Sequence, residues 1–180
     1  MDDRPREGRF DDLFAATYVE VLAFAIRRTG DREAAEDVAA ETFAVAWRKI
    51  DDVPGEPLGW LYAVARNLIS NQRRSERRRG RLLRRLSAER SGEGSGADPA
   101  TAVGESDASL RALARLKESQ REVLMLVAWE GADARVGSEA LGCSPGAFRI
   151  RLHRARKAFE EEMTRGLEPL PPATPTEETR

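Results

Sequence analysis

Apolar residues in the first half of the chain recur at intervals of three and four, which is the period of an α-helix. One such stripe begins at Phe10 and ends at Phe24. Gly30 then predicts the end of that helix, and Asp31 is a suitable N-cap for the next one. Two further apolar seams follow: Phe43, Trp47 and Ile50, and then Leu61, Val64, Ala65 and Leu68. The pattern predicts three helices within residues 10–86.

The second half of the chain repeats the helical period over residues 106–163. The sequence Ser119-Gln120-Arg121-Glu122 is typical of a capping box at a helix start, and Gly131 suits the end of that helix. A short helix is expected over residues 133–141. Ser144-Pro145 then forms an N-cap and first-turn pair that opens a longer helix. Two helices joined by a short turn with glycine predict a helix-turn-helix.

The two helical stretches are separated by a segment rich in Gly, Ser and charge, which lacks the apolar residues needed for a core. We therefore expect an all-α protein with two small helical domains, the C-terminal one a helix-turn-helix. The domains would be joined by a flexible linker. The expected ranges are 10–86 for the first domain, 87–105 for the linker, 106–163 for the second domain, and 164–180 for a disordered, proline-rich tail.

The net charge of −1 conceals a strong separation of charge along the chain. Residues 1–60 carry 8 basic and 14 acidic side chains, which gives −6. Residues 61–90 carry 10 arginines and two glutamates, which gives +8. Such asymmetry indicates two different partners, with nucleic acid the natural partner of the basic block.

Composition narrows the function classes further. The chain has one cysteine, Cys143, and one histidine, His153, so a thiolate metal cluster, a disulfide framework and most His-dependent catalysis are not expected. Its apolar runs are far shorter than a membrane span, and no secretory signal is evident at the N-terminus. We expect a cytoplasmic protein with no catalytic residues, no metal and no cofactor.

The clearest chemical signal is the last long helix. Its apolar seam leaves Arg149, His153 and Arg156 on another side, spaced as neighbours on one face. Arg151, Arg154 and Lys157 flank this face. A recognition helix places such side chains against base edges and phosphates in the major groove. The alternative to DNA recognition is a cationic helix face that is simply exposed to solvent.

The third predicted helix carries a second signal, because aromatic rings, amides and arginines occur together. Trp60 and Tyr62 offer rings on which an unstacked base could rest, and Asn67 and Asn71 can hydrogen-bond base edges. Phosphate attraction would come from a set of arginines: Arg66, Arg73, Arg74, Arg77, Arg78 and Arg79. The alternative, that both aromatic residues belong to the core, is at least as good an explanation of the rings.

The second predicted helix carries an acidic stripe formed by Glu33, Glu36, Asp37 and Glu41. It suits docking of a basic protein surface, with Trp47 as an anchor, although a solvated acidic face explains it equally well. Carboxylates at this spacing could also hold Mg²⁺ for nuclease chemistry. No additional ligands point to that function.

Taken together, these motifs resemble the extracytoplasmic-function group of bacterial RNA polymerase sigma factors. In the first block the resemblance rests on Asp31-Arg32-Glu33-Ala34-Ala35-Glu36-Asp37-Val38 through Trp47, and on Trp60-Leu61-Tyr62-Ala63-Val64-Ala65-Arg66-Asn67-Leu68. In the second block it rests on Gln120-Arg121-Glu122-Val123-Leu124 and on Gly142-Cys143-Ser144-Pro145-Gly146 through Arg156. The two blocks in this order across a linker cover nearly all of the expected ordered chain.

The resemblance implies a role for each block. The acidic helix would bind the clamp helices of the largest polymerase subunit through Glu36, Asp37, Glu41 and Trp47. The third helix would recognise and melt the −10 element through Trp60, Tyr62, Arg66, Asn67, Asn71 and Arg74. The recognition helix would read the −35 element through Arg149, Arg151, His153, Arg154 and Arg156. An anti-sigma factor is a further implied partner, and the polymerase would perform the chemistry.

Two positions depart from the family pattern. Arg135-Val136-Gly137 places a glycine inside the short helix, at a cost of roughly 1 kcal/mol relative to alanine. Asn71 stands where an aspartate is common. A helix-turn-helix regulator that binds duplex DNA without polymerase remains the main competing interpretation.

Overall fold

A computed structural model describes residues 4–87 and 105–167, and all regular structure within these ranges is helical. The elements are α1 (Arg4–Thr29), α2 (Arg32–Arg48), the 3-10 helix η1 (Ile50–Asp52), α3 (Leu58–Ser87), α4 (Glu105–Arg115), α5 (Glu118–Ala128), α6 (Ala134–Ala140) and α7 (Pro145–Leu167). None of the described helices is both long and apolar enough to span a membrane. The all-α fold class is confirmed.

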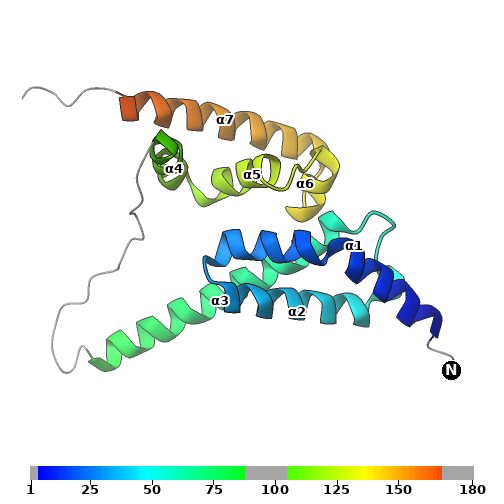
Figure 1. Ribbon diagram of the computed structural model, residues 1–180. Helices are drawn as coiled ribbons and strands as arrows, with labels where there is room; N and C mark the ends of the chain where they lie inside the picture. Colours follow the sequence, from blue (N-terminus) through cyan, green and yellow to red (C-terminus); the bar gives the residue numbers. More distant parts are fainter. Residues whose placement is uncertain (1–3, 88–104, 168–180) are drawn as a thin grey trace, which may run out of the picture.

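Helices α1, α2 and α3 form the N-terminal unit (Figure 1). Gly30 adopts a φ of 71° at the end of α1, and the Asp31 side chain accepts a hydrogen bond of 2.8 Å from the backbone of Ala34. The predicted helix end and N-cap are therefore confirmed. Residues from all three helices form the core of this unit, chiefly Val21, Ala39, Phe43, Ala46 and Leu61. The apolar seams predicted from the sequence thus face one another.

Helices α4 to α7 form the C-terminal unit, in which α6, a short turn and α7 make the helix-turn-helix. Asp133 caps α6, Gly142 supplies a φ of 60° in the turn, and the Ser144 hydroxyl caps α7 by accepting from the backbone of Ala147 at 3.2 Å. The capping box was expected two residues too late. Helix α5 begins at Glu118, and the Gln120 side chain accepts from the backbone of Lys117 at 3.2 Å.

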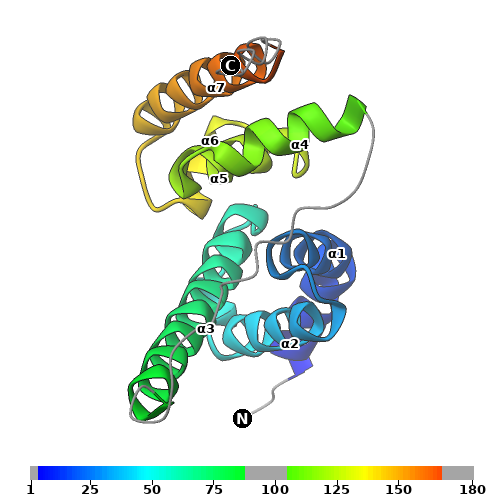
Figure 2. The same ribbon diagram turned by 90° about the vertical axis from the view of Figure 1, so that its left-hand side faces the viewer.

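The two units pack against each other in a closed arrangement. In Figures 1 and 2, α4–α7 lie over one side of α1–α3. A single core cluster runs through both units, with Phe24, Tyr62 and Ile69 from the first and Leu126 and Phe148 from the second. The sequence predicted two small helical domains joined by a flexible linker, and it did not predict that they share a core. Packing of one unit on the other was not predicted, because the apolar seam of each helix could be buried against the other helices of its own unit.

The structure describes only part of the segments predicted as linker and tail. The predicted linker falls outside the described residues from 88 to 104, as does the predicted tail from 168 to 180. Helix α7, however, continues to Leu167 and not merely to residue 163. Its last turns hold hydrogen bonds within the helix, from the Thr164 hydroxyl to the backbone of Glu160 and from Arg165 to Glu162. The prolines that suggested the tail begin only after these residues.

Candidate functional site

The acidic residues predicted to dock a protein partner lie together on α2. Glu36, Asp37 and Glu41 are exposed, while Val38 and Phe43 of the same helix are buried. Glu36 accepts a hydrogen bond of 2.8 Å from Arg32, one turn earlier, and both side chains remain accessible to solvent. An exposed ion pair of this kind contributes little to stability, so its carboxylate can exchange partners readily.

Trp47, the predicted anchor of this surface, is already engaged within the N-terminal unit. It is half-buried, its ring meets that of Phe10 edge to face at 5.3 Å between centroids, and the Arg6 guanidinium lies 5.7 Å from the ring centroid. Phe14, Tyr18 and Phe43 extend the same aromatic cluster. Trp47 therefore supports α1 against α2, and only part of its surface is left for a partner.

The predicted −10 residues of α3 lie in different environments. Trp60 is half-buried and packs against the core of the N-terminal unit. Arg66, Asn67 and Arg74 line a cavity of about 730 Å³ between α3 and α5. Asn71 is exposed. The cavity also takes in further basic and acidic residues, namely Arg28, Arg73, Arg77, Glu118 and Glu122.

Tyr62 is in the core of the closed protein and does not present its ring to solvent. It is 2 % exposed and stacks on Phe24 with ring centroids 4.6 Å apart and planes 11° from parallel. Burial, together with the negative charges of Glu130 and Glu20, raises the pKa of the Tyr62 phenol to about 12. In this arrangement no base can stack on the ring.

The predicted −35 residues are all exposed on α7, whose opposite face holds the buried Phe148 and Ala155. These residues are Arg149, Arg151, His153, Arg154 and Arg156. Arg151 and Arg154 line a second cavity, of about 460 Å³, together with Arg66 of α3. The structure therefore brings one predicted −10 residue and two predicted −35 residues to the same cavity.

Sequence reasoning missed the ion pairs that hold the units together. Arg28, in the last turn of α1, is 8 % exposed and donates hydrogen bonds to Glu122 at 3.1 Å and to Glu130 at 2.7 Å. Arg27 also pairs with Glu130, and Arg73 pairs with Glu118 at 3.2 Å. In the sequence, Arg27 and Arg28 look like ordinary basic residues at a helix C-terminus. No local signal links them to carboxylates about a hundred positions away.

The single histidine and cysteine lie in the helix-turn-helix. Cys143 is half-buried and packs against the shared core, and its backbone N–H donates to Ser138 at 2.9 Å. His153 is exposed on α7. Within residues 4–87 and 105–167 no group of three or more His, Cys, Asp or Glu side chains is placed to hold a metal ion.

Comparison with known proteins assigns each helical unit to a known family. Residues 13–79 match the family Sigma-70 region 2, and residues 107–159 match Sigma-70, region 4. The ECF RNA polymerase sigma factor SigL of Mycobacterium tuberculosis (strain ATCC 25618 / H37Rv) is 35% identical over 156 residues, which cover 82% of this chain and 86% of that protein. The probable RNA polymerase sigma factor RfaY of Xanthomonas campestris pv. campestris is 34% identical over 151 residues. That match covers 79% of this chain but only 37% of RfaY, so the chain spans well under half of that relative.

Among solved structures, the sigma factor RpoE in complex with the anti-sigma factor NepR, from Bartonella quintana, matches with a TM-score of 0.59 and 28% identity. The match covers 86% of this chain and 96% of that chain. Two matched regions, one on each helical unit, define the class as a DNA-binding transcription initiation factor of the Sigma-70 type. The chain belongs to the ECF RNA polymerase sigma factors, a family of initiation factors and not of enzymes.

Proposed function

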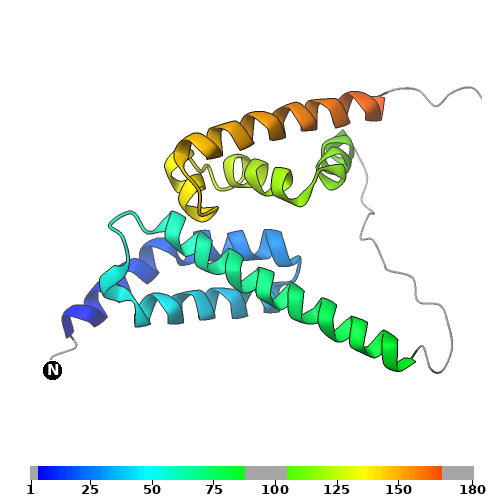
Figure 3. The same ribbon diagram turned by 180° about the vertical axis from the view of Figure 1, so that it is seen from behind.

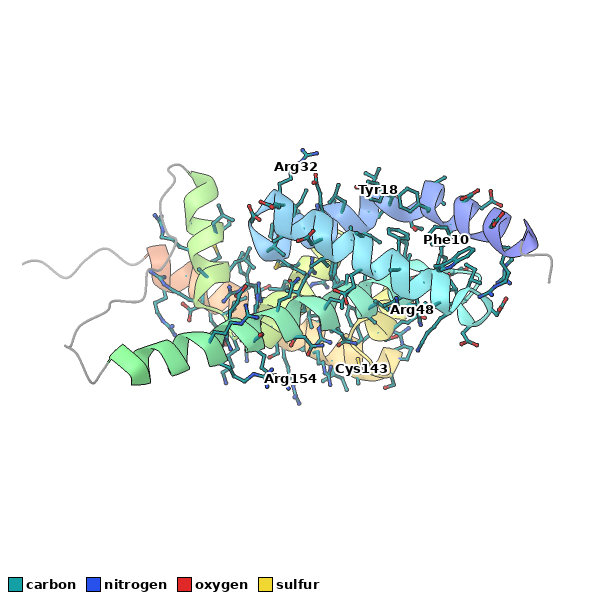
Figure 4. The ribbon with its side chains drawn as sticks, turned by 90° about the horizontal axis from the view of Figure 1, so that it is seen from below. Phe10, Tyr18, Arg32, Arg48, Cys143 and Arg154 are labelled. Carbon is teal, nitrogen blue, oxygen red and sulfur yellow. The ribbon has the colours of Figure 1, made fainter. Side chains whose placement is uncertain are left out.

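We propose that this sigma factor docks on the clamp helices of the largest subunit of core RNA polymerase through Glu36, Asp37 and Glu41. The observation that carries the proposal is the exposed acidic face of α2, which remains accessible in the closed protein. Figure 4 places Arg32, at the start of α2, on the edge of the molecule opposite Arg154 of α7. Polymerase and promoter DNA can therefore approach from different sides.

The promoter contacts are assigned to the two basic helices. Trp60, Arg66, Asn67, Asn71 and Arg74 of α3, with Tyr62 once it is uncovered, engage and help to melt the −10 element. Arg149, His153 and Arg154 of α7 read the −35 element, and Arg151 and Arg156 hold its phosphates. In support, all five α7 residues are exposed, and α7 is the second helix of the helix-turn-helix, capped at its start by Ser144. The polymerase performs the chemistry, and the chain itself needs no active site.

The chain acts where the polymerase acts, in the cytoplasm, and an anti-sigma factor controls it. The basis is the similarity to RpoE, which was solved as a complex with the anti-sigma factor NepR. The signal that would release the anti-sigma factor is a stress or envelope signal.

The test is association of tagged protein with core RNA polymerase, followed by initiation at a two-element promoter. We expect wild type to bind stoichiometrically and to direct initiation from that promoter. Asp37→Arg/Glu41→Arg should reduce binding by at least about a hundredfold, because it places two positive charges where a basic partner docks. The readout is the dissociation constant for core polymerase.

The matched control is Asp11→Arg/Asp12→Arg, which reverses two exposed carboxylates on α1 of the same unit. It should bind polymerase as wild type does. Wild-type protein that fails to bind core polymerase would contradict the proposal and favour a regulator that binds duplex DNA alone. Equal losses in both double variants would show that net charge, and not this face, governs docking.

A further inference from the structure

One large apolar side chain lies on the exposed face of the recognition helix α7. Ile150 is 56% exposed, whereas Phe148 and Ala155 in the apolar seam of the same helix are 1% and 0% exposed. At 3.6 residues per turn, Ile150 is rotated about 160° from Phe148 and about 140° from Ala155. Figure 3 shows α7, in gold to orange, along the edge of the C-terminal unit that lies away from α1 and α2. Ile150 therefore projects from the side of α7 opposite its seam.

The surroundings of Ile150 on this face are polar and basic. One turn earlier stands Gly146, where a Cβ atom would meet nothing within 4 Å, so no side chain there separates Ile150 from an approaching partner. The other neighbours lie one residue away in the sequence or three and four residues later, at the spacings that bring side chains together on a helix. They are four exposed residues already assigned to the −35 element: Arg149, Arg151, His153 and Arg154.

Neither packing nor helix propensity explains an isoleucine at this position. More than half of its side chain is in water, so it contributes little to the core. A β-branched residue is also a poorer helix former than arginine, lysine or glutamine. Single apolar side chains are common on protein surfaces, and Leu110 of α4, which is 51% exposed, is another in this unit. What distinguishes Ile150 is its place among the side chains assigned to DNA.

The chemistry of the major groove offers a specific partner for such a side chain. The groove edges of the base pairs present hydrogen-bond donors and acceptors, which arginine and histidine can bind but isoleucine cannot. Thymine alone adds a methyl group, at C5, and apolar side chains contact it. Packing of the Ile150 side chain on that methyl group would remove both from water, which is favourable.

We propose that Ile150 is a specificity-determining residue, which selects a T·A base pair in the −35 element by packing against the thymine methyl group. This inference rests on the proposed function, because it assigns one base contact to the helix that is proposed to read the −35 element. The flanking cations hold phosphates and base edges, and Ile150 supplies the apolar contact that they lack. One position of the preferred −35 element is therefore a thymine, on one strand or the other.

The test uses the full-length protein bound to core RNA polymerase, and promoter duplexes with a randomised −35 segment. The segment is synthesised in two forms, one with thymine and one with uracil, which differ only in the C5-methyl group. Bound duplexes are sequenced, and the preference for each base is measured at each position. Wild type should favour thymine at the position read by Ile150. That preference should fall about fourfold with uracil, as expected for one methyl group no longer removed from water.

Ile150→Ala should lose the preference for thymine at that position and should no longer distinguish thymine from uracil there. Preferences at the other positions should be retained. Ile150→Val, which keeps a branched apolar side chain, should retain most of the thymine preference. The matched control is Leu110→Ala, which removes an equally exposed apolar side chain outside α7 and should select as wild type does. Thermal midpoints of Ile150→Ala and Leu110→Ala should match wild type, because both side chains are exposed.

Three results would overturn the assignment of Ile150. They are a wild type that selects no thymine in the −35 segment, an Ile150→Ala profile equal to that of wild type, and a thymine preference that depends on Ile150 but persists with uracil. Failure of wild type to bind core polymerase would instead contradict the proposed function. The same two sets of duplexes are therefore also applied to the free protein, where selection by α7 is measured without polymerase. The two proposals can thus fail separately.

Discussion

Two glycines in this protein stand where a side chain would block close packing, and each serves a different contact. Gly59 allows α6 to approach α3, since a Cβ atom there would lie 2.9 Å from the Cβ of Glu139. Gly137 lies inside α6, where a Cβ atom would come 2.2 Å from a ring carbon of Phe148. The Phe148 ring therefore packs directly on the α6 backbone and is 1 % exposed. The glycine that lowers helix propensity in the sequence is what allows the recognition helix to bury Phe148.

Gly137→Ala is therefore expected to destabilise the protein even though alanine favours helices. The added methyl group must displace a buried aromatic ring, and overpacking of this kind costs about 1–3 kcal/mol. The measurement is the midpoint of thermal unfolding, which should fall by several degrees. Gly146→Ala is the matched control, since a Cβ there meets nothing within 4 Å. A midpoint for Gly137→Ala at or above that of Gly146→Ala would contradict this account of the ring contact.

At the level of single helices, the sequence was a good guide wherever the determining interaction is local. Gly30, Asp31 and Ser144 end or cap helices through atoms within four residues, so their types and spacing were sufficient. The predicted N-cap of α5 was two residues too late. The side chain of Gln120 accepts from the backbone of Lys117, so Lys117 and not Ser119 is the N-cap. The burial of Tyr62 could not be predicted, since part of its cover comes from the other unit.

The Asp31 cap gives an element-scale prediction. Asp31→Ala removes the side chain that accepts from Ala34 and leaves the first turn of α2 without that partner. A loss of about 1 kcal/mol is expected in the free energy of unfolding. Chemical denaturation at pH 7 measures this. Asp11→Ala, which removes an exposed carboxylate from the surface of α1, should change the free energy by less than about 0.5 kcal/mol. A loss as large in Asp11→Ala would show that charge, and not capping, is responsible.

For the molecule as a whole, the informative contacts are those between units. Arg28 and Glu130 are separated by 102 positions, and each is reasonable as a solvent-facing residue of its own helix end. Neither charge pattern nor hydrophobic period connects them. The sequence therefore predicted both units and their surfaces, but not that parts of the predicted DNA-contacting surfaces face one another in the closed protein. Closure is a property of the pair of units, visible only when both are folded.

Tyr62 offers a built-in reporter of that closure. Its pKa is raised from 10.0 to about 12, first by burial and then by the charge of Glu130 from the other unit. Between pH 10 and 12 the folded chain keeps a phenol proton that the unfolded chain has lost. Folding stability is thus unaffected by this group below about pH 10 and decreases as the pH rises toward 12, by up to about 2–3 kcal/mol.

We expect the phenolate absorbance of wild type, after subtraction of the Tyr62→Phe curve, to show a titration midpoint nearer 12 than 10. Glu130→Gln removes one of the charges that raises the pKa and loosens the cover over the ring, so its midpoint should shift downward. Asp51→Asn, which leaves the contact between units intact, should titrate as wild type does. A Tyr62 midpoint near 10 in the wild-type protein would mean that the ring is already in water, and that the free chain is open.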